Sequence, residues 1–138
     1  MKITSKIERS VLTIDEHRTV QEAAVLMNEK FVGSVVVTGS TGIRGLFTER
    51  DLMRVVGEKR DSSRVKLKDA ISADVVKVNP DETSSHCLDL MKEHRCRHLL
   101  VIDGSEFIGI VSLRDMVALM IEEKENLIGQ LKSYITGA

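Results

Sequence analysis

The chain has little of several residue types that mark particular protein classes. Its 138 residues include no tryptophan, one tyrosine, three phenylalanines, one proline and two cysteines. No apolar run approaches the roughly 18 residues of a membrane span, and the first ten residues lack the apolar core of a secretory signal, so we expect a cytoplasmic protein. Neither charge sign is in excess, with 20 Lys and Arg against 21 Asp and Glu, which argues against a surface for nucleic acid or anionic membrane.

The cysteines and histidines do not form a recognisable metal motif. The candidates are His86, Cys87, His94, Cys96 and His98. No two of them form a CxxC pair or an HExxH helix pair, the spacings that zinc sites use. We therefore predict no metal site, and expect both cysteines to be reduced and buried.

An internal repeat organises the sequence. Shifting the chain by 64 residues aligns residues 11–53 with 75–117 without a gap, and such self-similarity indicates two copies of one unit. Nine positions are identical: Val11/Val75, Thr19/Thr83, Leu26/Leu90, Met27/Met91, Glu29/Glu93, Val37/Val101, Gly45/Gly109, Arg50/Arg114 and Asp51/Asp115. With 42% apolar residues, the chain is long enough for one compact domain.

Hydrophobic periodicity predicts a mixed α/β (α+β) fold in which each copy has the order β-α-β-β-α. In the first copy Val11 and Leu12 indicate a short strand, and an apolar face from Val20 to Phe31 indicates a helix. Strands at 34–38 and 43–47 and a helix from Glu49 to Gly57 follow. The second copy predicts strands at 75–78, 98–102 and 107–111, a helix from about 83 to 94, and a final helix after 112.

The last helix continues beyond the repeat. Its apolar stripe comprises Leu119, Met120, Leu127, Leu131 and Ile135, with Glu123 among them, and we expect it to pack on a partner subunit; the alternative is that it folds back on its own domain. Residues 57–66 are charged and should be exposed. The expected organisation within 1–138 is a first motif at 11–57, a linker at 58–74, a second motif at 75–120 and a helical extension at 121–138.

A polar motif occurs once in each copy, as GLFTERD at 45–51 and GIVSLRD at 109–115. Its hydroxyl, Thr48 or Ser112, is predicted where a strand ends and a helix begins, a place that suits a phosphate. The carboxylate, Asp51 or Asp115, lies one turn later, where it can accept from the hydroxyls of a ribose. The motif is therefore a candidate nucleotide site.

The same motif also fits a helix capping box, in which the hydroxyl and the acid satisfy backbone N–H groups. A cap accounts for these two residues without a ligand. It does not account for the identical arginines, Arg50 and Arg114, or for a glycine that allows a ligand or backbone to approach closely.

Arg97 and His98 directly precede a predicted strand, where they can reach an anionic group. They are equally consistent with two exposed cations at a strand entry. The first copy has Gly33 and Ser34 at these positions, so two such pockets would differ in charge.

The segments TVQEAAVLMNEKFVGSVVVTGSTGIRGLFTERDLMRVV and TSSHCLDLMKEHRCRHLLVIDGSEFIGIVSLRDMV resemble the CBS-domain family in its paired form, the Bateman module. The C-terminal EEKENLIGQLKSYITG is similar to that of stand-alone CBS-pair proteins. The resemblance implies two copies packed about a pseudo-twofold axis, a disc-like homodimer, and clefts that bind AMP, ADP, ATP, NAD(H) or S-adenosylmethionine. The sequence departs from the family pattern at Gly33-Ser34 and at Ser84-Ser85-His86.

Carried over to this chain, the resemblance implies phosphate and ribose contacts at Thr48 with Asp51 and at Ser112 with Asp115. Arg97 and His98 match positions that face phosphate in the family. The expected adenine walls comprise Thr13, Ile14, Ser34, Val35, Lys77, Val78, Leu99 and Leu100, and the arginines Arg50 and Arg114 complete the candidate ligand-binding set.

Two functional hypotheses follow from these residues. The first is a non-enzymatic sensor that binds an adenosine nucleotide, needs no catalytic cofactor, and signals to a partner protein or through assembly. The second is an assembly module in which both motifs are only helix caps. An enzyme is not expected, because no nucleophile, general base or metal cluster accompanies the motifs.

Overall fold

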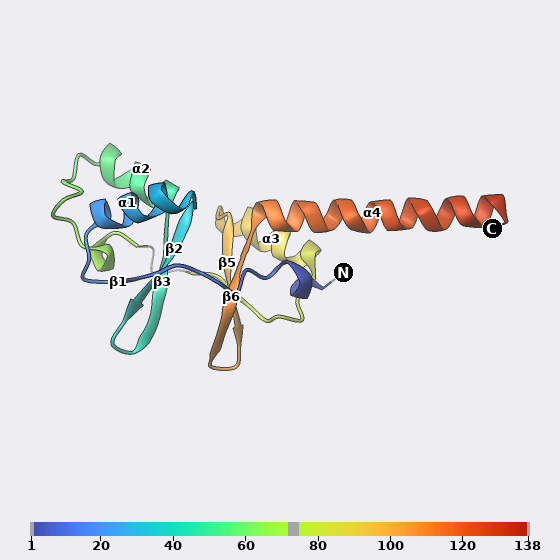
Figure 1. Cartoon of the computed structure of the whole chain (residues 1–138), viewed down its shortest axis with the longest axis horizontal. Helices are drawn as coiled ribbons and strands as arrows, with labels where there is room; N and C mark the ends of the chain where they lie inside the picture. The colour runs from blue at the N-terminus through green and yellow to red at the C-terminus, as the bar shows by residue number, and fades with distance from the viewer. Residues whose placement is uncertain (1, 72–74, 138) are drawn as a thin grey trace. The chain divides into compact units, whose positions relative to one another are not determined.

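The computed structural model, which describes residues 2–71 and 75–137, contains two compact units. The first unit is Ser10–Val75 and the second unit is Met1–Arg9 with Val76–Ala138. The predicted mixed α/β fold, with β-α-β-β-α order in both copies and a long C-terminal helix, is confirmed. Figure 1 shows these elements along the chain.

The first unit is a small sheet covered by two helices. Its elements are β1 (Thr13–Asp15), α1 (Val20–Lys30), β2 (Ser34–Gly39), β3 (Gly42–Thr48), α2 (Glu49–Gly57) and the 3₁₀ turn η2 (Leu67–Asp69). The central strand β2 pairs parallel with β1 and antiparallel with β3.

The second unit repeats this arrangement. Its elements are η1 (Ile3–Lys6), β4 (Lys77–Val78), α3 (Ser84–His94), β5 (His98–Asp103), β6 (Glu106–Ser112) and α4 (Leu113–Thr136). Here β5 is central, between parallel β4 and antiparallel β6. Each element begins 64 residues after its counterpart in the first half, so the two halves fold alike.

The structure corrects two local predictions. The first strand begins at Thr13, which pairs with Val36, so the apolar Val11 and Leu12 only lead into it. Phe31 does not lie on the buried face of α1. It follows the helix in the left-handed conformation, with φ 55°, and is 95% exposed; Arg95 adopts the same conformation after α3, with φ 53°.

Each unit has its own hydrophobic core. The first core comprises Val20, Ala23, Met27, Val35, Val37, Phe47, Val55, Leu67 and Ala70. The second comprises Ile3, Val78, Cys87, Met91, Leu99, Val101, Val111, Met116 and Leu119. Because most members of one list lie 64 residues from a member of the other, the repeated apolar pattern mainly encodes these two cores.

The segment before each half of the repeat packs with the elements of the other half. Ile3 is fully buried in the second core, and its N–H donates to the Glu82 carbonyl at 3.0 Å. Leu67, its counterpart, is fully buried in the first core, and its N–H donates to the Arg18 carbonyl at 2.9 Å. The repeat therefore starts earlier than the self-alignment indicates.

The segment between the two predicted motifs has two parts. Residues 57–66 are mostly exposed, whereas Leu67 and Ala70 belong to the first core. Residues 72–74 lie outside the described part of the chain. None of the described helices is long and apolar enough to cross a membrane.

Candidate functional site

Each copy of the polar motif starts a helix, and each forms a complete capping box. In the first unit the Asp51 N–H donates to Thr48 Oγ1 at 3.3 Å, and the Thr48 N–H donates to Asp51 Oδ2 at 2.9 Å. In the second unit the Asp115 N–H donates to Ser112 Oγ and the Ser112 N–H to Asp115 Oδ2, both at 3.1 Å. The capping interpretation is therefore confirmed, and each cap leaves one carboxylate oxygen outside it.

The remaining carboxylate oxygens have different surroundings. In the first unit Asp51 Oδ1 accepts from Arg54 at 3.3 Å, and Arg54 also donates to the Ala70 carbonyl. The counterpart of Arg54 in the second unit is Ala118, whose side chain has no donor. Within the described residues Asp115 Oδ1 has no hydrogen-bond partner, so it is the better placed of the two to accept from a ligand.

The repeated glycine serves the backbone at one of its two positions. At Gly109 a Cβ would clash with the carbonyl oxygen of Glu8. The Glu8 N–H donates to the Ile110 carbonyl at 2.9 Å, and the Ile110 N–H donates back at 3.0 Å. Gly109 therefore admits the chain's own N-terminal segment, and the residue corresponding to Glu8 in the first unit, 72, lies outside the described residues.

A cavity of about 460 Å³ opens at the polar motif of the second unit. The cross-strand pair His98 and Ser112 lies at its base. The Leu113 N–H donates to the Arg97 carbonyl at 2.8 Å, which holds the motif beside the strand entry. The cavity is lined by Arg97, His98, Ser112, Leu113, Arg114 and Val117. Its size lies within the range of small-molecule pockets, and its two arginines favour an anion.

The matching surface of the first unit has the opposite charge character. The Glu49 N–H donates to the Gly33 carbonyl at 3.0 Å, as Leu113 does to Arg97. An acid thus replaces an apolar residue, and a glycine replaces an arginine. A Cβ on Gly33 would lie 3.1 Å from Glu49 Oε1, so the carboxylate covers this position. It would repel a phosphate.

The predicted wall residues divide between exposed strand positions and the cores. Thr13 and Lys77 are exposed, and Ile14 is half-buried. Ser34 is buried opposite Thr48 in the β2–β3 pairing. The side chains of Val35, Val78, Leu99 and Leu100 are buried, so a ligand contact at these positions would involve peptide groups. Sequence reasoning missed Glu49, Leu113 and Val117, although the aligned repeats already pair Glu49 with Leu113.

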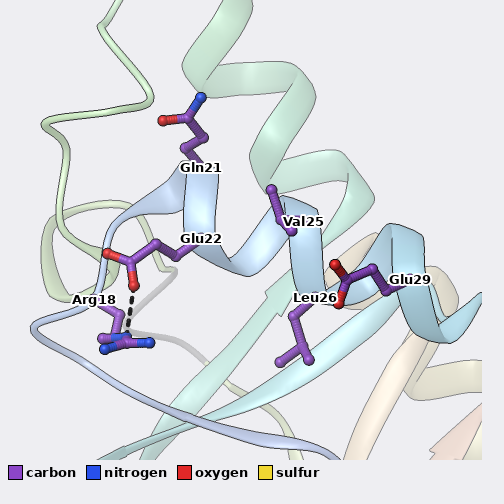
Figure 2. Close-up of a pocket in the computed structure, with 6 residues that line it drawn as sticks. All are labelled: Arg18, Gln21, Glu22, Val25, Leu26 and Glu29. Atoms are coloured by element: carbon purple, nitrogen blue, oxygen red, sulfur yellow. Dashed lines mark ion pairs between the residues drawn. The ribbon is translucent and has the colours of Figure 1, made fainter.

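A second cavity, of about 350 Å³, lies on α1 of the first unit and contains no residue of the polar motif (Figure 2). It is lined by Arg18, Gln21, Glu22, Val25, Leu26 and Glu29. Arg18 Nε forms an ion pair with Glu22 Oε2 at 2.7 Å, so the one cation in this lining is already neutralised. This cavity lacks the positive charge of the second unit's cavity.

The thiols are not arranged for metal chemistry. Cys87 is buried in α3, and burial together with the nearby Glu82 carboxylate raises its pKa to about 11. Burial also raises the pKa of Cys96. Both thiols are free and stay protonated near neutral pH, whereas a metal ligand must be a thiolate. Among the described residues no three His, Cys, Asp or Glu side chains cluster to hold a metal ion.

Comparison with known proteins gives matches along both halves. The family model "CBS domain" matches residues 4–58 and again 67–122. CBS domain-containing protein YhcV of Bacillus subtilis is 32% identical over 107 residues, which cover 77% of this chain and 76% of that protein. A putative signal-transduction protein with CBS domains from Burkholderia ambifaria has a TM-score of 0.80 and 35% identity, over 87% of this chain and 91% of that one. A CBS domain protein from Pyrobaculum aerophilum, solved in complex with AMP, has a TM-score of 0.73 and 21% identity, over 83% and 89%.

Proposed function

Because the chain belongs to the CBS domain family, a family of regulatory modules, we propose that it senses an adenosine nucleotide through the polar motif of its second unit. The observation that carries the proposal is the cavity of about 460 Å³, which joins Arg97 and Arg114 to the start of α4. Asp115, with one carboxylate oxygen outside the cap, adds the acceptor that a ribose requires.

The residues divide the ligand between them by charge. A phosphate lies near the arginines, where charge-assisted hydrogen bonds and the positive end of the α4 dipole favour it. His98 and Ser112 lie at the same end of the cavity. Asp115 Oδ1 accepts from a ribose hydroxyl, while Oδ2 stays in the cap. The capping and ligand-binding roles of the motif are thus compatible.

The wider proposal keeps the other expectations from the sequence. Adenine lies against the strand positions Thr13, Ile14, Ser34, Val35, Lys77, Val78 and Leu99, and ADP, ATP, NAD(H) and S-adenosylmethionine are further candidates beside AMP. The protein is cytoplasmic and homodimeric, catalyses no reaction, and passes its occupancy to a partner or to its assembly. A ligand shifts such an equilibrium only by its differential affinity for the two states. The complex of a related protein with AMP supports the choice of AMP as first probe.

We expect AMP to stabilise the protein against thermal unfolding, and expect Arg97→Ala and Arg114→Ala each to weaken AMP binding about tenfold. Each substitution removes one cation from the cavity. Isothermal titration calorimetry at fixed ionic strength measures both changes. The matched control is Arg50→Ala, the counterpart of Arg114 beside Glu49, which should change the affinity less than about twofold.

An equal loss in Arg50→Ala and Arg114→Ala would contradict the assignment to the second unit. If no adenosine ligand shifts the unfolding temperature, the sensor is wrong and the assembly module is favoured, because any ligand specific to the folded state must stabilise it.

Asp115→Asn is expected to weaken AMP binding about tenfold while leaving the free energy of unfolding within about 1 kcal/mol. Asparagine keeps one oxygen for the cap, but it puts an NH₂ donor where a ribose hydroxyl needs an acceptor. Calorimetry and chemical unfolding measure the two quantities separately. Asp51→Asn is the control, since Arg54 already occupies the corresponding oxygen; unchanged AMP affinity in Asp115→Asn would mean that this acid acts only as a cap.

A further inference from the structure

The C-terminal half of α4 has no packing partner within the described chain. Met116 and Leu119 are buried in the second core, and Glu122 still pairs with Lys6 at 2.8 Å. From residue 124 to 136 every residue is exposed, and Figure 1 shows this part of α4 continuing beyond α3. A helix of about this length is marginally stable in water by itself, so it needs another surface.

The exposed side of α4 carries a heptad pattern. Ile121, Ile128 and Ile135 recur every seven residues, and Val117 and Leu131 lie three or four residues from them. The side chains of Val117, Ile121, Ile128 and Leu131 are 45–52% exposed, and Ile135 is 80% exposed. Apolar residues spaced alternately by three and four are the seam of a helix pair. A row of Leu127 and Tyr134 widens the seam on one side.

Charge decides which partner and which direction fit this seam. Lys124 occupies a seam position between Ile121 and Ile128. In a parallel pair of identical helices, this lysine would face its own copy in an apolar layer, which is unfavourable. An antiparallel pair can place Lys124 beside Ile135 of the partner subunit, near the end of the seam where its ammonium reaches water.

The flanking residues select one antiparallel register. With Ile128 beside Leu131 of the partner subunit, Glu125 faces Lys132 of the partner subunit on one side. Leu127 then faces Tyr134 of the partner subunit on the other. A shift of one heptad in either direction pairs Glu125 with its own copy or Lys132 with its own copy, so like charges meet.

We propose that two copies of the chain associate through α4 in this antiparallel register, centred between Gly129 and Gln130. The pairing covers the exposed isoleucines and matches every charged flanking residue with an opposite charge. It rests on the homodimer in the proposed function and specifies its surface. It does not depend on nucleotide binding.

We expect Ile128→Glu to raise the dimer dissociation constant at least about tenfold, as measured by sedimentation equilibrium of the full chain. Ile128 is half exposed in the single chain, so the variant should keep the wild-type helix content by circular dichroism. Ser133→Glu, on the opposite side of the helix, is the control and should change the constant less than about twofold. A monomeric wild-type protein, or a dimer unaffected by Ile128→Glu, would overturn the proposal.

Charge exchange tests the register. Glu125→Lys and Lys132→Glu should each weaken the dimer, because each creates two like-charge pairs, and the double variant Glu125→Lys/Lys132→Glu should return to within about threefold of the wild type. Additive losses in the double variant would exclude this register.

The failure of this proposal is distinguishable from failure of the sensor. AMP titrations of the Ile128→Glu variant report the nucleotide site alone, since Ile128 does not line the cavity. A wild-type dimer without AMP binding would retain the helix pairing and reject the sensor. AMP binding by a wild-type monomer would do the reverse.

Discussion

Replacing Ile3 with alanine is expected to lower the free energy of unfolding by about 2–4 kcal/mol, because it leaves a cavity in a fully buried apolar site. The loss should appear in the second unit, although Ile3 precedes the first half of the repeat. Its side chain packs with the second core, and its N–H binds the Glu82 carbonyl.

Denaturant unfolding gives the size of this loss, and hydrogen exchange gives its location. Amides of α3 and β5 should lose protection, while those of α1 and β2 keep it. Leu67→Ala is the matched variant, because Leu67 is the counterpart of Ile3 in the first core, and it should show the reverse pattern. Loss of protection in α1 on substitution of Ile3 would contradict the exchange of segments.

The second large effect is expected for Gly109→Ala, which should cost about 2–3 kcal/mol in stability. The new methyl group would clash with the Glu8 carbonyl oxygen, a backbone atom that cannot rotate away as a side chain does. Relief requires the N-terminal segment to leave β6, with loss of the two hydrogen bonds between Glu8 and Ile110.

Urea unfolding measures this cost, and hydrogen exchange at Ile110 reports release of the segment. Gly57→Ala is the control, because a Cβ on Gly57 meets nothing within 4 Å. If Gly109→Ala is as stable as this control, the close approach of Glu8 does not occur in solution.

The regular elements were predictable because their signals are local. Apolar spacing sets the helices, and alternating apolar runs with a glycine-bearing turn set the hairpins. Ile3 and Leu67 escaped, because a single apolar residue in a polar segment shows no period. Only the pairing of Ile3 with Glu82 across the fold reveals that it belongs to a core.

The candidate site shows the same division. The motifs at Thr48 and Ser112 were found because they are repeated, and their capping geometry follows from the local spacing of hydroxyl and acid. The difference between the two sites depends on what lies beside each cap. Glu49 against Gly33, and Leu113 against Arg97, are neighbours only because a helix start folds onto a strand entry. The sequence comparison contained these pairs without indicating their contact.

The exchange of segments also limits how the chain can be divided. A cut before the second half would leave each half without the residue, Leu67 or Ile3, that completes its core. Each half expressed alone should therefore need the other half's leading segment in order to fold.

The continuity of α4 has a mechanical consequence. One uninterrupted helix begins at the cap of Ser112 and ends at Thr136, a length of about 36 Å at 1.5 Å per residue. Such a helix acts as a stiff lever arm. A tilt of about 10° at the capped end would move the free end by roughly 6 Å, more than one helical turn. Small rearrangements beside Asp115 would thus be enlarged at the distant tip.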